Sequence, residues 1–320
     1  MTSANSSNLA AKFSPKVQES FKTLALTNNA INRDYDFIGV NTVEIYHIKT
    51  SAMNSYDRGG SVSGRSGIGR YGAVSDLGST KETLILRNDR SFTFSIDKKD
   101  NAEMMGVLNP GTALKRQIEY VVVPEIDKYR FGAIVNEVDS EGGYKVSKEI
   151  SKNNAYECLL DGVTKMLNDG VPMAGAVVYI SPYFYKQIRL DPSFIKSSDV
   201  AQNMLIKGQV GEIDGLPLVL VPDSYFPSQT NGTQEKWSHL NKIDTLVPTS
   251  DRIEFMISNK AAVVGAENLI DYKVHDNPPG INGWLIEGRI CYDAFVLKEK
   301  KHMIYVHTQT ESNRTAGLPK

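Results

Sequence analysis

Alternating apolar and polar positions predict strands near both ends of the chain. Phe37 to Ile48 is rich in β-branched residues and predicts a strand. Residues 91 to 96 alternate phenylalanine and isoleucine with polar residues, after a turn signal at Asn88–Asp89. The segment Thr83 to Arg87 would supply the other strand of this hairpin. Together these signals predict a long two-stranded projection over residues 46 to 96.

A helical period dominates the middle of the chain. The pair Asn109–Pro110 predicts a helix start, and apolar residues keep a helical spacing to about Val135. At 1.5 Å per residue, such a helix would span on the order of 40 Å. Pro124 removes one backbone hydrogen bond, so we expect a kink or a split there. Further helices are predicted at Asn154–Asn168 and Pro182–Leu190.

Strands and helices alternate over residues 150 to 245, which is typical of a compact α/β domain. Its predicted strands are Ala176–Ile180 and Leu216–Val221. Four more strands are predicted after this region, at Arg252–Ser258, Ala261–Ala266, Trp284–Leu297 and His302–His307. The strand from Trp284 needs a long partner, and a turn at Lys298 to Lys301 would supply it as a hairpin.

Two segments near the N-terminus do not fit a packed core. The stretch from Asp57 to Gly72 is too polar and too rich in glycine to be buried, so we expect it to reach outward, as in an assembly protein. Before the first strand, Ser14–Pro15 predicts the start of a short amphipathic helix in an N-terminal arm. Its apolar face could pack on its own domain or on a neighbour, because so small a segment is not stable alone.

Composition limits the possible functions. The chain has 320 residues, of which 41% are hydrophobic, enough for two modest domains or one elaborated domain. The 36 basic and 37 acidic residues nearly cancel, which argues against binding to nucleic acid through a large net positive charge. Only Cys158 and Cys291 are present, which suits a reducing compartment. No apolar stretch predicts a signal peptide or a membrane span, so we expect cytosolic synthesis and no membrane partner.

The sequence contains few residue patterns that indicate catalysis. Gly67 to Gly72 matches the dinucleotide-binding glycine pattern, but polar sequence flanks it where a strand and a helix are required. The five histidines lack metal-ligand spacing, and a surface or hairpin histidine is the better account of each. Cys158 lies on an apolar helix face, where we expect a buried, inert thiol. We therefore expect no enzyme activity, no catalytic residue, no cofactor and no metal, and interpret Glu125 and Asp127 as solvated or interface charges.

The order of these parts resembles the major capsid proteins of tailed bacteriophages, whose fold is shared with encapsulin nanocompartments. The resemblance covers nearly all of residues 13 to 308. The segments that are similar to the family are the strand Asp36–Tyr46, the proline-containing spine-helix segment Val121–Phe131, the apical-domain segments Val178–Pro182 and Gly208–Pro222, and the closing strand Tyr292–Leu297.

This resemblance implies an α+β fold, the tailed-phage major capsid fold, with six parts. They are an N-terminal arm (1–36), a strand and extended β-hairpin loop (37–100), the spine helix and the start of the peripheral domain (101–150), an apical α/β domain (151–247), peripheral-domain strands (248–308) and a C-terminal tail (309–320).

The function implied is self-assembly as pentamers and hexamers into an icosahedral shell around phage double-stranded DNA. Such a protein is part of the virion capsid and is assembled in the cytoplasm of the host bacterium. The expected partners are other copies of the chain, a portal protein, a separate scaffolding protein as a hypothesis, and DNA contacted without sequence specificity. An encapsulin-like nanocompartment shell and a non-shell interaction module are the alternatives.

In such a shell the projection would lie across one neighbour, and the arm would pack beneath another. The arginines of the glycine-rich segment would meet acidic surface on a neighbour or would only keep the loop soluble, and the sequence leaves both open. The candidate interface residues are Arg58, Arg65, Arg70, Phe13, Val17, Phe21, Glu125 and Asp127.

Overall fold

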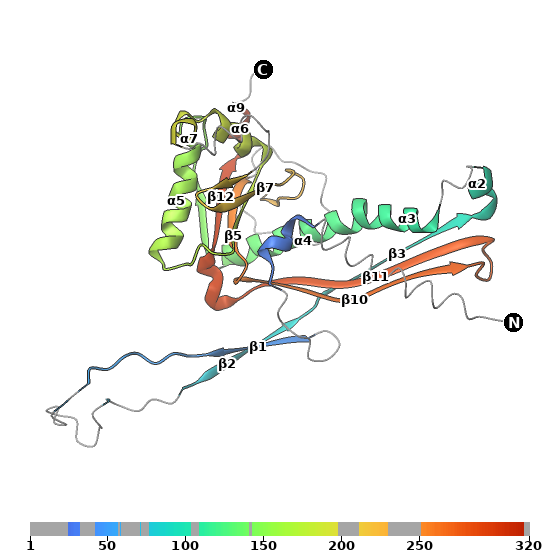
Figure 1. The fold of residues 1–320 in the computed structure, drawn as a ribbon, viewed down its shortest axis with the longest axis horizontal. Coiled ribbons are helices and arrows are strands. Elements are labelled where there is room, and N and C mark those ends of the chain that lie inside the picture. Colours follow the sequence, from blue (N-terminus) through green and yellow to red (C-terminus); the bar gives the residue numbers. More distant parts are fainter. Residues whose placement is uncertain are drawn as a thin grey trace. The chain divides into compact units, whose positions relative to one another are not determined.

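The structure, a computed structural model, describes residues 25–32, 42–56, 58, 71, 77–103, 109–140, 143–197, 211–229 and 251–316 (Figure 1). The chain forms two compact units. The smaller unit runs from Tyr35 to Leu86, and the larger one combines Met1–Asp34 with Arg87–Lys320. Among the described residues, no helix is both long enough and apolar enough to cross a membrane.

The smaller unit is an antiparallel hairpin. Its strands are β1 (Thr42–Ile48) and β2 (Ser79–Ile85), which pair along their full length. Beyond the strands, the rings of Tyr56 and Tyr71 lie edge to face with their centroids 5.1 Å apart, so the two chain segments stay close there. The pairing of β1 with β2 confirms a two-stranded element in this part of the chain, but not its predicted extent of residues 46 to 96, because residues 88 to 97 belong to another sheet.

The hairpin turn predicted at Asn88–Asp89 is wrong. The chain runs from β2 directly into β3 (Asn88–Asp97), and β3 pairs with β11 (Gly283–Val296) rather than with residues 83 to 87. The alternation in β3 is real, because Ile96 is buried and Phe92 and Phe94 pack against the same apolar cluster as the spine helix. A period of two reveals a strand with one buried face but does not identify its partner.

Three antiparallel strands of the larger unit form a long sheet in the order β10–β11–β3 (Figure 1). β10 (Val263–Asp276) precedes β11 in the chain and is its long partner. The prediction that the turn at Lys298 to Lys301 leads to the partner of β11 is wrong. That segment is a 3₁₀ helix, η3 (Lys298–Met303), and it leads into β12 (Ile304–Thr310), which belongs to another sheet.

The spine helix has three consecutive parts. α3 (Pro110–Gln117) begins at the predicted proline, and a π-helical turn, η2 (Ile118–Val122), joins it to α4 (Val123–Ser140). The predicted irregularity is confirmed, since the wide turn ends at Val122, two residues before Pro124, which has no N–H to donate. The helix does not end near Val135, as predicted, but continues to Ser140.

The second sheet has the strand order β4–β12–β9–β5–β7–β6, and β8 pairs with β9. The bounds of its strands other than β12 are β4 (Tyr144–Ser147), β5 (Ala176–Ile180), β6 (Glu212–Ile213), β7 (Leu216–Leu220), β8 (Ser228–Gln229) and β9 (Asp251–Asn259). The sequence placed the strands of β9 and β12 in the peripheral domain. The structure instead pairs β9 with β5, a strand of the α/β region, and β12 with β9.

Helices cover both faces of this sheet. α5 (Ala155–Asn168) and α6 (Pro182–Leu190), both close to their predicted bounds, share a buried cluster with β5, β7 and β9. Leu167, near the end of α5, is 53% exposed. The remaining short helices are η1 (Leu26–Ala30), α2 (Lys98–Glu103), α7 (Pro192–Ser197) and α9 (Glu311–Ala316).

The spine helix connects the two sheets. Its C-terminal half, including Phe131, Ile134 and Val138, packs on the sheet that contains β5 and β9. Its earlier part, from Leu114 to Ile126, packs with β3 and β11 of the three-stranded sheet. Asp127, Tyr129 and Arg130 therefore lie where the two apolar cores meet.

Candidate functional site at the root of the N-terminal arm

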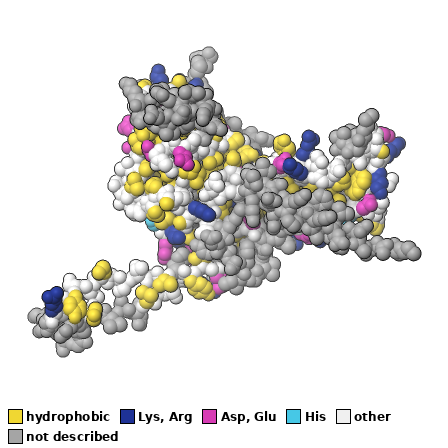
Figure 2. Space-filling view, viewed as in Figure 1, with side chains coloured by type: hydrophobic (Ala, Val, Ile, Leu, Met, Phe, Trp, Pro, Cys, Tyr) yellow, Lys and Arg dark blue, Asp and Glu magenta, His cyan; other side chains and the backbone are white. Residues whose placement is uncertain are grey.

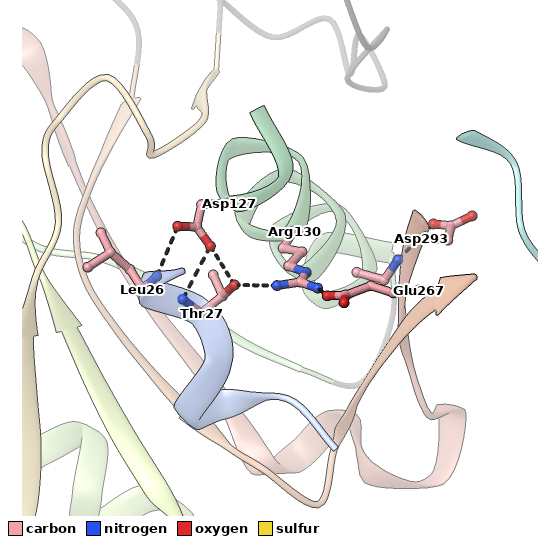
Figure 3. Close-up of polar contacts among 7 residues, drawn as sticks. Leu26, Thr27, Asp127, Arg130, Glu267 and Asp293 are labelled. Atoms are coloured by element: carbon pink, nitrogen blue, oxygen red, sulfur yellow. Dashed lines mark hydrogen bonds and ion pairs between the residues drawn. The ribbon is translucent and has the colours of Figure 1, made fainter. Parts of the chain in front are cut away.

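Asp127 of α4 holds the N-terminal segment in place (Figure 3). Its carboxylate accepts hydrogen bonds from the Leu26 N–H at 2.9 Å, the Thr27 N–H at 3.3 Å and the Thr27 hydroxyl at 2.6 Å. The first N–H groups of a helix have no partner within it, and this carboxylate supplies one for η1. Because Asp127 is fully buried in its own chain, the interpretation of it as a solvated or interface charge is wrong.

Burial and hydrogen bonding have opposite effects on the pKa of Asp127. Removal from water raises the pKa of the Asp127 carboxyl, while the hydrogen bonds from Thr27 and Leu26 and the nearby Arg130 act in the opposite direction. The N-terminal segment thus supplies the donors that stabilise a carboxylate inside the core.

Arg130 extends the network from the spine helix to β10 (Figure 3). Its Nη1 donates to the Thr27 hydroxyl oxygen at 3.0 Å, and its Nη2 contacts Oε1 of Glu267. The Arg130 side chain is fully buried, and that of Glu267 is only 12% exposed. A buried guanidinium is tolerated when it is paired and hydrogen-bonded. Thr27 therefore joins two buried charges, since it donates to Asp127 and accepts from Arg130.

Backbone contacts fix the rest of the segment along the edge of β10. The Asn32 N–H donates to the Val263 carbonyl at 2.8 Å, and the Gly265 N–H donates to the Asn32 carbonyl at 3.2 Å. Ile31 is 1% exposed and lies over Gly265, where an added Cβ would come within 2.1 Å of the Ile31 Cγ2. Only glycine permits this close approach.

A second polar network lies on β11. The buried Asp293 accepts hydrogen bonds from the Tyr129 hydroxyl at 2.5 Å and from the Arg87 N–H and Nε at 3.0 and 3.2 Å. Burial and the Asp293 carboxylate both raise the pKa of Tyr129, so the phenol stays protonated and donates. Arg87 is the residue just before β3, and this network fixes the start of that strand on the spine helix and β11.

Glu125 has partners within its own chain. It accepts hydrogen bonds from Arg90 Nε at 2.8 Å and from the Tyr292 hydroxyl at 3.1 Å, and its side chain is 32% exposed. Glu125 and Asp127 therefore contact different groups. Glu125 thus links β3 and β11 to the spine helix. Its role at an interface between copies stays a prediction.

Few of the other predicted interface residues are described. Arg58 is exposed in the hairpin unit. Outside the described residues lie Phe13, Val17, Phe21, Arg65, Arg70 and most of the glycine pattern Gly67–Gly72. Cys158 is buried and free, as predicted, and burial raises the pKa of its thiol. No group of three or more histidine, cysteine, aspartate or glutamate residues within the described ranges could hold a metal ion.

His307 corrects the prediction of surface histidines. It is 1% exposed in β12, its ring stacks on Phe255 with the centroids 4.8 Å apart, and its Nε2 lies 3.0 Å from the Lys148 carbonyl. Because a carbonyl only accepts, Nε2 must carry the proton of the neutral ring. Burial is the main cause that lowers the pKa of His307 to about 4.

A buried carboxylate in β9 was missed at the sequence level. Glu254 is fully buried, accepts a hydrogen bond from the Ser181 hydroxyl at 2.6 Å, and lies 3.5 Å from Nε of Arg314. Arg314 of α9 also donates to Asp223 at 2.7 Å and lies over the Tyr183 ring. These partners are far apart in sequence, so no local spacing could have identified them.

Solved structures with a similar fold include chains of bacteriophages and a chain of a virus-like particle. A chain of Mycobacterium phage Che8 matches with a TM-score of 0.61 and 15% identity, over 91% of this chain and 92% of that chain. A chain in the capsid of the cyanophage P-SCSP1u matches with a TM-score of 0.60 and 12% identity, over 88% and 86%. A chain of a virus-like particle from Pyrococcus furiosus matches with a TM-score of 0.50 and 10% identity, over 93% and 98%. No family model and no curated protein matches the sequence.

These likenesses establish the fold. The chain has the tailed-phage major capsid fold, which confirms the α+β class and the resemblance found in the sequence. The residue boundaries of the six parts stay predictions, as do the absence of enzyme activity, of a cofactor and of a metal.

Proposed function

We propose that this chain is the major capsid protein of a tailed bacteriophage. It assembles as pentamers and hexamers into an icosahedral shell around double-stranded DNA. The observation that carries the proposal is the capsid fold, shared over almost the whole length of the chain with phage capsid chains. Assembly takes place in the host cytoplasm, and the chain then resides in the virion.

The hairpin unit supports a role in assembly. In an antiparallel pair, residues directly opposite one another share a face, and Tyr46, Ile48 and Ile85 lie on one such face of β1 and β2. They are 61%, 71% and 59% exposed, and hydrophobic side chains are visible on the hairpin surface (Figure 2). An isolated two-stranded hairpin is marginally stable in water, so this face gains most by covering a neighbouring copy.

The contact surfaces follow from this role. The hairpin, with Arg58, Arg65 and Arg70, reaches a neighbour, and the arm, with Phe13, Val17 and Phe21, packs beneath another copy. A scaffolding protein and a portal protein are further partners. The near-balance of 36 basic and 37 acidic residues suits DNA contact without sequence specificity. The chain has no catalytic role.

A non-viral shell is the second candidate function. The likeness to a chain of the virus-like particle from Pyrococcus furiosus favours it, because that chain has a similar fold. The two functions differ in their content: a phage shell requires a portal and takes up DNA, whereas a nanocompartment closes without either.

The test is expression of the full chain, alone and together with any scaffolding protein encoded beside it, followed by size-exclusion chromatography and electron microscopy. Closed shells, pentamers or hexamers are expected. A monomer or dimer under every condition would contradict a shell function. Shells that close fully with twelve equivalent vertices and no portal position, when the portal protein is also present, would favour the nanocompartment.

A further inference from the structure

The turn between β10 and β11 ends in an asparagine followed by a glycine. The turn runs from Asn277 to Asn282, and Gly283 is the first residue of β11. Asn282 is exposed, whereas Gly283 is buried. Within the part of the chain that the structure describes, the side-chain amide of Asn282 has no hydrogen-bond partner. This amide is therefore free to turn toward the main chain.

Close packing against β3 requires the glycine of this pair. A Cβ at position 283 would overlap the Ile96 carbonyl oxygen and would lie 3.0 Å from the Asp97 Cα. Both are main-chain atoms, which cannot turn aside as the end of a flexible side chain can, so only glycine fits there. The fold thus excludes a larger residue after Asn282, which would crowd an attack on the Asn282 amide.

The main chain next to Asn282 supplies a nucleophile. The Gly283 nitrogen attacks Asn282 Cγ, and the new N–Cγ bond closes a five-membered imide ring. The Cγ–Nδ2 bond breaks, and Nδ2 leaves as ammonia together with the proton of the Gly283 N–H. Water then opens the ring. Opening at Cγ gives aspartate, whereas opening at the main-chain carbonyl gives isoaspartate, in which the chain continues through the former side chain. The net reaction consumes one water, releases one ammonia and involves no oxidation.

Two main-chain hydrogen bonds depend on this linkage. The Lys98 N–H at the start of α2 donates to the Asn282 carbonyl at 3.1 Å, and the Asn277 N–H donates to the Gly283 carbonyl at 2.8 Å. In isoaspartate, the former Asn282 carbonyl is a carboxylate outside the main chain, and the main chain is one carbon longer. The isoaspartate form therefore disturbs both hydrogen bonds, whereas the aspartate form only adds a negative charge at an exposed position.

We propose that Asn282–Gly283 is a site of spontaneous deamidation, which converts the β10–β11 turn into an aspartate form and an isoaspartate form. The chain supplies the nucleophile, and water is the only co-reactant. Because ammonia is lost, the modified forms accumulate with the age of the protein. The proposal is independent of the shell function, since the reaction takes place within the turn of a single chain.

The test is incubation of the purified full chain in mildly alkaline water enriched in heavy oxygen, followed by trypsin digestion and mass spectrometry. The tryptic peptide Val274–Arg289 contains both asparagines of the turn. We expect a carboxyl group labelled with heavy oxygen to accumulate at Asn282. Its rate should be within about tenfold of the rate in the urea-unfolded chain, because the exposed side chain is not held by the fold.

The chain offers matched controls. Asn277 lies in the same peptide but precedes Pro278, whose nitrogen has no hydrogen to lose, so its amide should stay intact. Asn168 is also exposed but precedes Asp169, and it should react about tenfold or more slowly than Asn282, because only glycine leaves the attacking nitrogen uncrowded. The variant Asn282→Gln keeps an exposed amide but would need a larger ring, so it should remove the modification.

The isoaspartate form has its own readout. Methylation by an isoaspartyl methyltransferase should label the aged wild-type chain and leave the Asn282→Gln variant unlabelled. Hydrogen exchange at the Lys98 and Asn277 amides should be about tenfold faster in the isoaspartate form than in the fresh chain, because their acceptors have moved.

Three results would overturn the proposal. One is an intact Asn282 amide in the folded chain under conditions in which the unfolded chain reacts, because the fold would then protect the site. Another is an equal rate at Asn282 and Asn168, since the glycine would then have no effect. The third is a labelled product that fails to increase with time. None of these results bears on whether the chain forms shells.

Discussion

Gly265→Ala is the sharpest test of how the N-terminal segment is held. The added Cβ would lie 2.1 Å from the Ile31 Cγ2, closer than real Cβ contacts come. It would also lie 3.2 Å from the Ile31 Cδ1, which is tighter than most such contacts. Ile31 is 1% exposed, and the close packing of a protein core leaves a buried side chain little room to move. The expected response is displacement of Ile31 from the edge of β10.

The cost follows from what the segment loses. Expelling a fully buried isoleucine costs about 1.5–3 kcal/mol, and each backbone hydrogen bond between Asn32 and β10 contributes about 0.5–1.5 kcal/mol. Replacing glycine with alanine returns about 0.4–1 kcal/mol by restricting the unfolded chain. We therefore expect the free energy of unfolding to fall by about 2–5 kcal/mol.

A double-mutant cycle isolates the cause. Ile31→Ala alone should cost about 2–5 kcal/mol, because it leaves a cavity in the core. With the long side chain gone, Gly265→Ala should add little. The double variant should therefore lose less stability than the sum of the two single variants, by about 2 kcal/mol or more. The assay is urea unfolding of the unassembled chain, with hydrogen exchange at the Asn32 amide as the local readout. Costs that add to within about 0.5 kcal/mol, or an Asn32 amide as protected as in wild type, would refute the steric argument.

Three further predictions concern buried polar groups. Asp127→Ala should lower the free energy of unfolding by about 3 kcal/mol, because three donors of the N-terminal segment lose their acceptor. Urea unfolding measures this loss, with Asp169→Ala at an exposed position as the control. Arg314→Met should lower the thermal midpoint by removing the cation beside the buried Glu254, and adding Glu254→Gln should recover part of the loss. For His307, the folded pKa of about 4 lies below the unfolded value of about 6.5, so the unfolded state binds more protons between these pH values. Stability should therefore fall by up to roughly 3 kcal/mol as pH drops through this window, and a His307→Gln variant that showed the same pH dependence would contradict the assignment.

Elements with a local period were predictable from the sequence. The apolar face of α5, the continuous apolar run of β5 and the helix start at Pro182 each depend on neighbours within a few residues. The family resemblance then supplied the architecture that local patterns lack.

Strand partners were the main failure, because a period of two is the same whatever the partner. β3 lies beside β11, almost two hundred residues further along the chain, and only burial of its apolar face against the spine helix selects that pairing. Likewise β12 follows β11 closely in sequence yet pairs with β9, since η3 carries the chain from one sheet to the other.

The buried carboxylates could not be predicted from the sequence for a related reason. At the sequence level Asp127 is one of several charges on a helix, and its donors, Leu26 and Thr27, lie about a hundred residues earlier. One feature of the sequence could have identified this site. Gly265 interrupts the apolar run of β10, and a glycine inside a strand often marks a close approach of another backbone.

This glycine bears on a question that the sequence left open, namely whether the N-terminal arm packs on its own domain or on a neighbour. For residues 25 to 32 the answer is the chain's own domain, because Ala25, Thr27 and Ile31 are buried within it. The network of Asp127, Arg130 and Glu267 encloses Thr27 between the spine helix and β10. The residues before Ala25 therefore start from a segment that is held by the spine helix and by β10, so a force on them would act on the spine helix directly.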